Sequence, residues 1–238
     1  MNEHQKVVIV TGASQGIGAG LVAGYRTLGY AVVANSRTIA RSDDPMVLTV
    51  PGDIGSPGVG AEIVEAALRR FGRVDSVVNN AGIFVSKPFT EYTDEDYEAV
   101  MGVNVRGFFD VTRAAVRAMT SRPGGGHVVN VSTSLVDRAD ARVPAALAAV
   151  SKGGLNAVTK SLAIEYAARG IRSNAVALGI IDTPMHDPSS HDALAGLHPL
   201  GRLGDVDDVV NAVLYLETAS FVTGEILHVD GGQSAGLT

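Results

Sequence analysis

Short apolar runs alternate with longer segments of helical spacing along the chain. The run at residues 7–10 is typical, because it is brief and β-branched, like a strand buried on both faces of a parallel sheet. In the intervening segments apolar residues recur every three or four positions, which predicts helices that cover a sheet. The predicted strands are 7–10, 30–34, 47–50, 74–78, 127–131, 171–177 and 225–229, and the predicted helices are 17–28, 61–71, 94–119, 145–168 and 205–217. This alternation predicts an α/β fold with a doubly wound parallel sheet of about seven strands.

No linker or change of composition divides this pattern. We therefore expect residues 1–238 to form a single domain. One segment, about 183–203, is polar and contains Pro188 and two serines, which predicts a mobile flap that closes over a substrate.

Composition excludes several classes of function. The net charge is −6 and the Lys and Arg residues form no sizeable cluster, so we expect neither nucleic acid nor a membrane as a partner. The chain has no cysteine, and its histidines lack a pattern of metal-ligand spacing, so no metal site is expected. The first residues lack the apolar core of a signal peptide, and no apolar run reaches membrane-spanning length, which favours a cytoplasmic location.

A glycine-spaced turn follows the first predicted strand. Gly12, Gly16 and Gly18 lack a Cβ where the chain must turn sharply and where the next helix must pack close to the strand. An anion at that helix N-terminus would meet free N–H groups and the positive end of the helix dipole. The turn predicts a cradle for the pyrophosphate of a dinucleotide, with an ordinary βα turn as the alternative.

The tip of the second strand indicates which dinucleotide. Asn35, Ser36 and Arg37 stand where a carboxylate usually binds the 2′-hydroxyl of NAD. No carboxylate is present, and the Arg37 guanidinium can bind a 2′-phosphate, so we predict NADP rather than NAD. The alternative is a solvated arginine.

Polar and small residues also follow later strands. Asp53 and Ile54 could meet an adenine, or Asp53 could be a turn residue. The run 79–82 would let a cofactor lie close to the backbone. Asn104 lies inside a predicted helix, which indicates a bond to a neighbouring loop, a backbone distortion or a water near the active site. The hydroxyls at 132–134 could meet a ligand or serve as caps.

These motifs together resemble those of the short-chain dehydrogenase/reductase family. They are TGASQGIG at 11–18, NNAG at 79–82, NVRGFF around Asn104, HVVNVSTS, SLAIEYAARGIRSNAV at 161–176, IDTPM at 181–185 and VTGEILHVDGG near the end, in the order of the family. The resemblance covers nearly the whole chain and implies a Rossmann-type domain that transfers a hydride between a nicotinamide cofactor and a carbonyl or alcohol. The cofactor-binding residues that it implies are Gly12, Ser14, Gln15, Gly16, Ile17, Gly18, Ser36, Arg37, Asp53, Ile54, Asn80, Ala81, Gly82, Lys152, Gly179, Ile181 and Thr183.

The resemblance also assigns the catalytic positions. Lys152 matches the family's lysine, Asn104 its asparagine and Thr133 its serine, although Ser132 or Ser134 could take the place of Thr133. The family's tyrosine, which donates the proton, is replaced by Ala148. The proton could instead come from Lys152, from a water on Thr133, or from one of three residues in nearby loops, Asp137, Asp140 and His186. Reduction of a cationic iminium would need no proton.

Three hypotheses follow. The first is an NADP-dependent oxidoreductase, acting on a carbonyl or imine-like small molecule with an atypical proton donor. The second is a non-catalytic NADP-binding sensor or partner subunit, and the third is an engineered Tyr→Ala variant. In each case the helices 94–119 and 145–169 and the HVDGG tail resemble the family's subunit interfaces, which implies a homo-oligomer, a tetramer in preference to a dimer.

Overall fold

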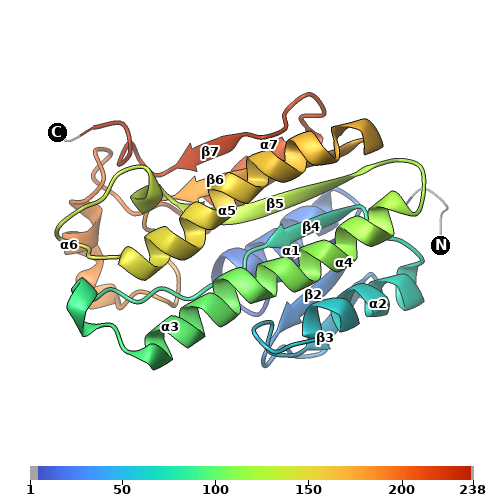
Figure 1. The fold of residues 1–238 in the computed structure, drawn as a ribbon, viewed down its shortest axis with the longest axis horizontal. Helices are drawn as coiled ribbons and strands as arrows, with labels where there is room; N and C mark the ends of the chain where they lie inside the picture. Colours follow the sequence, from blue (N-terminus) through green and yellow to red (C-terminus); the bar gives the residue numbers. More distant parts are fainter. Residues whose placement is uncertain (1–4, 237–238) are drawn as a thin grey trace.

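The computed structural model describes residues 5–236 and contains one sheet of seven parallel strands (Figure 1). The strands are β1 (Val7–Thr11), β2 (Ala31–Ser36), β3 (Val47–Pro51), β4 (Ser76–Asn79), β5 (Gly126–Thr133), β6 (Ile171–Leu178) and β7 (Ile226–Val229). The predicted α/β fold and strand number are confirmed.

The strand order is β3-β2-β1-β4-β5-β6-β7. The chain first extends the sheet from β1 through β2 to β3, and then returns to the other side of β1 with β4. Val8 accordingly pairs with Val32 of β2 on one side and with Ser76 of β4 on the other. Doubly wound sheets bind ligands beyond the carboxyl ends of the strands where the order reverses, which in this sheet is at β1 and β4.

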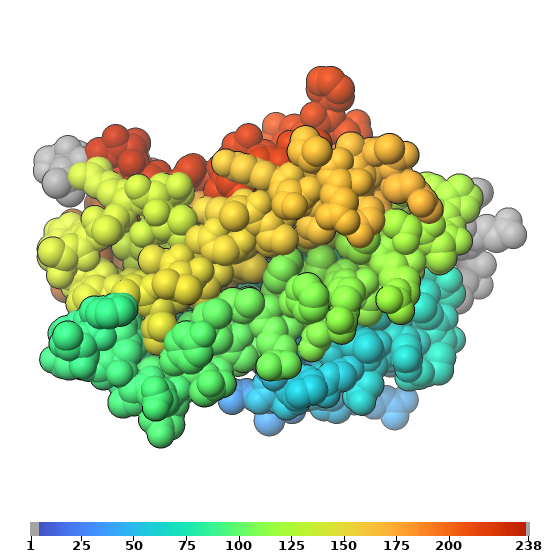
Figure 2. Space-filling model, viewed as in Figure 1, coloured from blue at the N-terminus to red at the C-terminus, as the bar shows by residue number. Residues whose placement is uncertain are grey.

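Helices cover both faces of the sheet (Figure 1). Leu21 and Val209 pack with Val8 on one face, and Ile63 and Val111 pack with Ile9 on the other. The first face is covered by α1 (Gly16–Thr27) and α7 (Val206–Thr218), and the second by α2 (Val59–Phe71), α4 (Phe108–Thr120) and α5 (Ala146–Glu165). Figure 2 shows α4 and α5 as neighbouring green and yellow bands on the surface of the second face.

The predicted helix 94–119 is interrupted. It consists of α3 (Asp94–Met101), a π-helical turn over Gly102–Gly107 and α4. At its start, Thr93 and Asp96 form a reciprocal capping box. A π-turn inserts one residue into the hydrogen-bond ladder without disturbing the apolar spacing on either side, so the side-chain pattern does not reveal it.

The remaining differences are at element ends. The second strand continues to Ser36 and includes Asn35, and α5 ends at Glu165 before a 3₁₀ turn over Ala167–Arg169. The segment 183–203 contains a 3₁₀ turn (Pro188–Ser190) and the short helix α6 (His191–Ala195).

Among residues 5–236, no helix has both the length and the apolar character that crossing a bilayer requires.

A buried carboxylate joins several elements at the amino edge of the sheet. Glu217 of α7 accepts hydrogen bonds from the hydroxyls of Tyr25 (2.9 Å), Tyr30 (2.8 Å) and Ser76 (2.9 Å) and from Nδ1 of His127 (3.0 Å). These donors lie on α1, just before β2, at the start of β4 and near the start of β5, so one side chain joins α7 to α1 and to the amino ends of three strands. We call this set the Glu217 cluster.

Candidate functional site

The turn between β1 and α1 has the close backbone contacts that its glycines predict. Gly12 and Gly16 have φ values of 66° and 51°, which favour glycine. A Cβ on Gly12 would lie 2.9 Å from Nδ2 of Asn80, and one on Gly18 would overlap the carbonyl of Gly12. Asn80 Nδ2 itself donates to the carbonyls of Thr11 (2.9 Å) and Gly12 (3.2 Å). The β4 loop therefore braces the turn.

The N-terminus of α1 is open to an anion. Its first turn has no acidic residue, and Gln15, at the cap, makes no side-chain capping bond. Ser14 and Gln15 are exposed, whereas Ile17 is half-buried against the core. The first N–H groups of α1 thus have no side-chain acceptor, as a site for a phosphate requires.

The tip of β2 lies next to this turn. Ser36 Oγ donates to Ser14 Oγ (2.9 Å), whereas Asn35 is buried and its amide donates to the carbonyls of Val50 (2.9 Å) and Gly52 (3.1 Å). Arg37 is exposed and forms no hydrogen bond or ion pair with another described residue. Its guanidinium is free to meet an anionic group beside Ser14 and Ser36.

The residues after β3 have different surroundings. Asp53 is exposed and its carboxylate accepts from the Gly55 N–H (2.9 Å), which is the turn role that the sequence left open. Ile54 is 6% exposed and packs in the core against Gly107. Little of the Ile54 side chain is left for an adenine, so its part in binding stays a prediction.

Lys152, Asn104 and Gly82 meet in one place. A Cβ on Gly82 would lie 3.0 Å from Lys152 Nζ and 3.4 Å from Asn104 Oδ1. Asn104 lies in the π-turn, and its amide bonds both backbone groups of Ile83, accepting from the N–H (2.9 Å) and donating to the carbonyl (3.1 Å). Both the distortion and the loop contact expected for Asn104 are present.

The Lys152 ammonium donates to the carbonyl of Val131 (2.7 Å) at the end of β5. Burial disfavours the charged amine and lowers the pKa of Lys152 to about 8. At neutral pH the side chain therefore still carries its proton, but holds it less tightly than an exposed lysine does.

The three hydroxyls at the carboxyl end of β5, Ser132, Thr133 and Ser134, differ in their hydrogen bonds. Ser132 is 4% exposed and donates to the carbonyl of Lys152 (3.4 Å). Ser134 is fully buried and bonds the Leu178 carbonyl (3.1 Å) and the Gln233 side chain (2.8 Å). Thr133 is half-buried and its oxygen accepts only from the N–H of Leu135 (3.3 Å). Of the three, Thr133 is the hydroxyl that remains able to donate to a substrate.

The loop after β6 approaches the glycine turn. A Cβ on Gly16 would lie 3.3 Å from the Cβ of Thr183. The Ile181 side chain is 4% exposed in the core, while its N–H and carbonyl form no hydrogen bond with another described residue. Because buried backbone groups are almost always paired, these two groups are fitted to receive an amide from a ligand. Gly179 precedes them and lies against His198.

This arrangement has known relatives. A protein family described as "Enoyl-(Acyl carrier protein) reductase" matches residues 12–234, nearly the whole chain. The chain belongs to the short-chain dehydrogenase/reductase family. One relative is 3beta-hydroxysteroid dehydrogenase 1 from Eggerthella lenta. It is 36% identical to this chain over 246 residues, which cover 96% of this chain and 94% of that protein.

Two solved structures are also similar to this chain. The 3-ketoacyl-(acyl-carrier-protein) reductase from Brucella melitensis, complexed with NADH, has a TM-score of 0.88 and 32% identity, covering 96% of this chain and 98% of that one. A blue fluorescent protein from a metagenomic library, in complex with NADPH, has a TM-score of 0.86 and 34% identity, covering 98% and 99%.

Ala148 is the residue that the sequence comparison with the family places where a tyrosine is expected. It lies on α5 one helical turn before Lys152, as the spacing predicts, and is 3% exposed. Its methyl group can donate no proton.

Asp140, Asp137 and His186 are the loop residues that could donate a proton in place of a tyrosine. Each is either bound to another side chain or in a protonation state that does not favour donation near pH 7. Hydrogen bonds from Arg142 hold the pKa of Asp140 at about 2, so this carboxylate is ionised at neutral pH. Asp137 pairs with His228 (3.0 Å). Burial lowers the pKa of His186, which leaves its ring neutral near pH 7.

Several residues that shape the site were not predicted. Thr11 Oγ1 accepts from the N–H groups of Asn80 (3.1 Å) and Ala81 (3.0 Å), and Ser151 Oγ accepts from the Asn104 amide (3.2 Å). His198 Nε2 accepts from the N–H of Ile180 (2.9 Å). Thr11 adjoins the glycine motif and Ser151 adjoins Lys152, so position could have suggested both. Nothing in the sequence around His198 marks it.

Proposed function

We propose that this protein is an NADPH-dependent oxidoreductase that reduces a carbonyl or imine-like small molecule with an atypical proton donor. The observation that carries the proposal is the meeting of Lys152, Asn104 and Gly82. Lys152 also donates to the carbonyl of Val131, two residues before Thr133, whose hydroxyl is free to donate. These are the positions that the family uses to hold the nicotinamide ribose and to orient a carbonyl. We also propose that residues 1–238 form one NAD(P)-binding domain, with 183–203 as its substrate flap.

The residues fit the cofactor from its 2′-phosphate to its nicotinamide. The open N-terminus of α1 suits the pyrophosphate, the free N–H and carbonyl of Ile181 suit the carboxamide, and Lys152 suits the ribose between them. Arg37 and the absence of a carboxylate at the tip of β2 favour a 2′-phosphate. When bound, the reduced nicotinamide supplies the hydride.

Lys152 is the proton donor in this proposal. Its pKa of about 8 makes it a stronger acid than an ordinary lysine, and no tyrosine at position 148 separates it from a substrate on Thr133. As the hydride reaches the substrate carbon, the oxygen or nitrogen gains electron density, accepts a hydrogen bond from Thr133 and takes a proton from the ammonium. The neutral amine then regains a proton from solvent.

The test is oxidation of NADPH with a panel of ketones, aldehydes and imines, followed spectroscopically. We expect measurable turnover that falls as the pH rises through about 8, because the ammonium is then deprotonated. Lys152→Met should lose at least about a hundredfold in kcat/KM, the usual contribution of a general acid together with lost cofactor contacts. Lys160→Met, an exposed lysine on the same helix, is the matched control. Turnover that is flat between about pH 6.5 and 9, or unchanged in Lys152→Met, would contradict the role of Lys152.

The second candidate is a non-catalytic NADPH-binding sensor or partner subunit. The observation that favours it is Ala148, which is buried and offers no proton. NADPH binding without oxidation across the whole panel would favour this reading over the first.

A further inference from the structure

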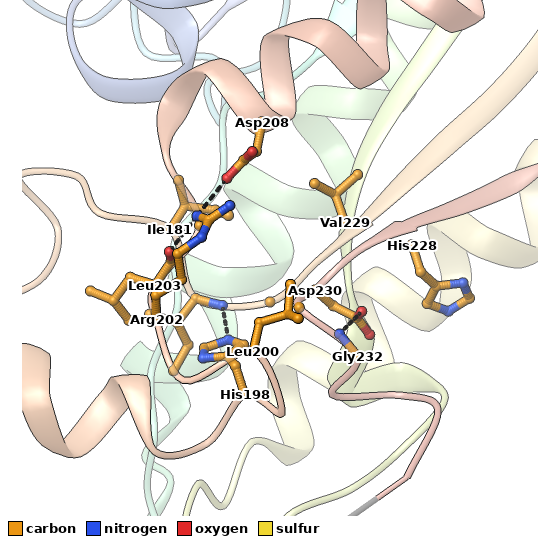
Figure 3. A pocket seen from close by; sticks show the side chains of 14 residues that line it. Ile181, His198, Leu200, Arg202, Leu203, Asp208, His228, Val229, Asp230 and Gly232 are labelled. Carbon is orange, nitrogen blue, oxygen red and sulfur yellow. Dashed lines mark hydrogen bonds and ion pairs between the residues drawn. The ribbon is translucent and has the colours of Figure 1, made fainter.

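His198 joins the flap to the loop that follows β6. Its Nε2 accepts a hydrogen bond from the N–H of Ile180 at 2.9 Å, as the dashed line in Figure 3 shows. The ring is 5% exposed, although it lies beside a cleft of about 340 Å³. Two glycines make room for it: a Cβ on Gly179 would lie 2.7 Å from Nε2, and one on Gly231, where φ is +58°, would lie 3.2 Å from the His198 Cβ. The ring is therefore seated in a closely fitted site.

The bond to Ile180 bears directly on Ile181. On one side of Ile181, Ile180 is held by His198; on the other, the N–H of Asp182 donates to the carbonyl of Gly204 (2.8 Å). Gly204 also donates its own N–H to the Ile180 carbonyl (3.0 Å). The unpaired N–H and carbonyl of Ile181 are thus held in place by contacts that all come from the segment 198–204.

The bond also defines the protonation state of the ring. An imidazole nitrogen that accepts an N–H bond carries no proton, so the proton of neutral His198 is on Nδ1. Nδ1 is buried and forms no hydrogen bond of ordinary geometry, although the backbone carbonyls of Leu194 and Ala195, at the end of α6, lie near the ring. A second proton on Nε2 would point directly at the Ile180 N–H, and the two donors would repel.

Charged groups near the ring are largely paired with one another. Asp230, at the end of β7, faces His198 but accepts from the N–H groups of Gly232 (3.0 Å) and Ser234 (2.8 Å). The other charged or titratable groups that line the cleft are Arg202, which pairs with Asp208 (2.8 Å), and His228, which pairs with Asp137 (3.0 Å). Burial lowers the pKa of His198, partly opposed by the Leu194 carbonyl and by Asp230, so the ring is neutral near pH 7.

We propose that His198 is a positioning residue that holds Ile181 in its cofactor-binding position through Ile180, and that protonation of its ring below neutral pH releases this hold together with the flap. The proposal rests on the proposed function in that Ile181 meets the nicotinamide end of NADPH. It adds a pH-dependent coupling between the flap and cofactor binding.

The test measures NADPH dissociation constants by fluorescence, and hydrogen exchange of the peptide that contains Ile180, from about pH 7 to about pH 5, where histidines titrate and Lys152 keeps its charge. In the parent protein, acidification should weaken NADPH binding about threefold to tenfold and should speed exchange at Ile180 beyond the intrinsic change with pH, because one hydrogen bond is lost. His198→Gln offers an amide oxygen that accepts without titrating, so acidification should weaken its NADPH binding clearly less than that of the parent. His198→Ala should bind more weakly at every pH.

His228→Gln is the matched control, because His228 lines the same cleft but makes no contact with Ile180. It should keep the parent's pH profile. The proposal is overturned if His198→Gln keeps the parent's pH dependence, or if His198→Ala leaves both NADPH affinity and exchange at Ile180 unchanged. Neither readout requires turnover. If no substrate is reduced, the proposed reaction fails while binding and exchange still decide the role of His198; if NADPH does not bind, exchange in the free protein decides it.

Discussion

Ala148 is 3% exposed and lies on the same side of α5 as Lys152. We expect Ala148→Tyr to place a phenol near Thr133 and Lys152, where the ammonium lowers its pKa and makes it a better acid. Reduction of ketones should rise by about a hundredfold or more. Inserting a ring at a buried position should also lower the free energy of unfolding by about 1–3 kcal/mol.

Ala148→Phe separates these two effects. It should show the same loss of stability in urea titrations but no gain in kcat/KM, because it lacks the hydroxyl. Equal rates for the Tyr and Phe variants would show that the rest of the site is not arranged for a phenol. The gain should also disappear when Lys152→Met is combined with Ala148→Tyr.

Arg37 forms no hydrogen bond or ion pair with another described residue, so removing its side chain should change the stability of the free protein little. We expect Arg37→Ala to weaken NADPH about tenfold to a hundredfold, the usual range for a charge-assisted bond to a phosphate, and to leave NADH nearly unchanged. Arg41→Ala, another exposed arginine after β2, is the control. Titration of both cofactors measures the effect, and equal affinity of the parent for NADH and NADPH would refute the preference.

Many individual residues of the candidate site could be predicted from the sequence, because their amino-acid type limits the role that they can have. Gly12, Gly16 and Gly18 are required where the backbone approaches itself, so their role is visible in the sequence. Lys152 and Thr133 were placed by resemblance, and the freedom of the Thr133 hydroxyl among its neighbours is visible only in the structure. The bond of His198 to Ile180 could not be predicted. It joins residues 18 positions apart, and its donor is a backbone N–H, which the type of residue does not reveal.

Among the helices, α7 is joined to the sheet through the Glu217 cluster. Burial by itself raises the pKa of Glu217, but hydrogen bonds, from His127 first and then from Tyr30 and Ser76, bring it down to about 2. A folded-state pKa below the unfolded value of 4.5 means that the carboxylate stabilises the fold above that pH. This contribution is lost as the pH falls from about 4.5 towards about 2.

We therefore expect Glu217→Gln to lower the free energy of unfolding at pH 7 by about 1–3 kcal/mol, because charged hydrogen bonds are replaced by weaker ones. The difference between parent and variant should shrink as the pH falls towards the folded-state pKa. Urea unfolding across this range measures both. Glu225→Gln, at an exposed glutamate, is the control. A parent that loses no more stability in acid than Glu217→Gln does would contradict the linkage.

The interrupted helix between Asp94 and Thr120 shows why elements are harder to predict than periodicity suggests. Apolar spacing defined both halves correctly, but the π-turn at Gly102–Gly107 depends on backbone hydrogen bonds that side-chain pattern does not encode. Asn104 was the one visible sign, because a buried amide needs partners, and the turn directs it to Ile83.

At the scale of the molecule, α4 and α5 lie side by side on one face (Figure 2), and both expose large apolar side chains. Phe109 is 54% exposed, Val150 60% and Ile164 81%. We expect a homo-oligomer, a dimer or tetramer, that covers this face. Sedimentation should show a species larger than a monomer at micromolar concentration, and Ile164→Asp should shift it to smaller species. Leu68→Asp, at a 39% exposed position on α2, should not. A parent that sediments as a monomer would refute the assembly.

The fold itself was largely predictable, because seven β-branched runs separated by helical segments leave few other arrangements. The positions of β2 and β3 on one side of β1 and of β4 to β7 on the other follow from the resemblance more than from the pattern. The hydrophobic pattern does not predict side-chain hydrogen bonds between residues far apart in the sequence, such as those from Tyr25 and Ser76 to Glu217.

The Glu217 cluster lies at the amino edge of the sheet, whereas Gly12, Lys152 and Ile181 lie beyond the carboxyl ends of its strands. The two edges are separated by the length of the strands, so substitutions at one are nearly additive with substitutions at the other. A lineage that kept the first edge could lose, move or regain a catalytic group at the second without crossing the threshold of unfolding. The same separation makes the carboxyl edge suitable for randomisation: a library at and around position 148 explores new chemistry while the opposite edge preserves the fold.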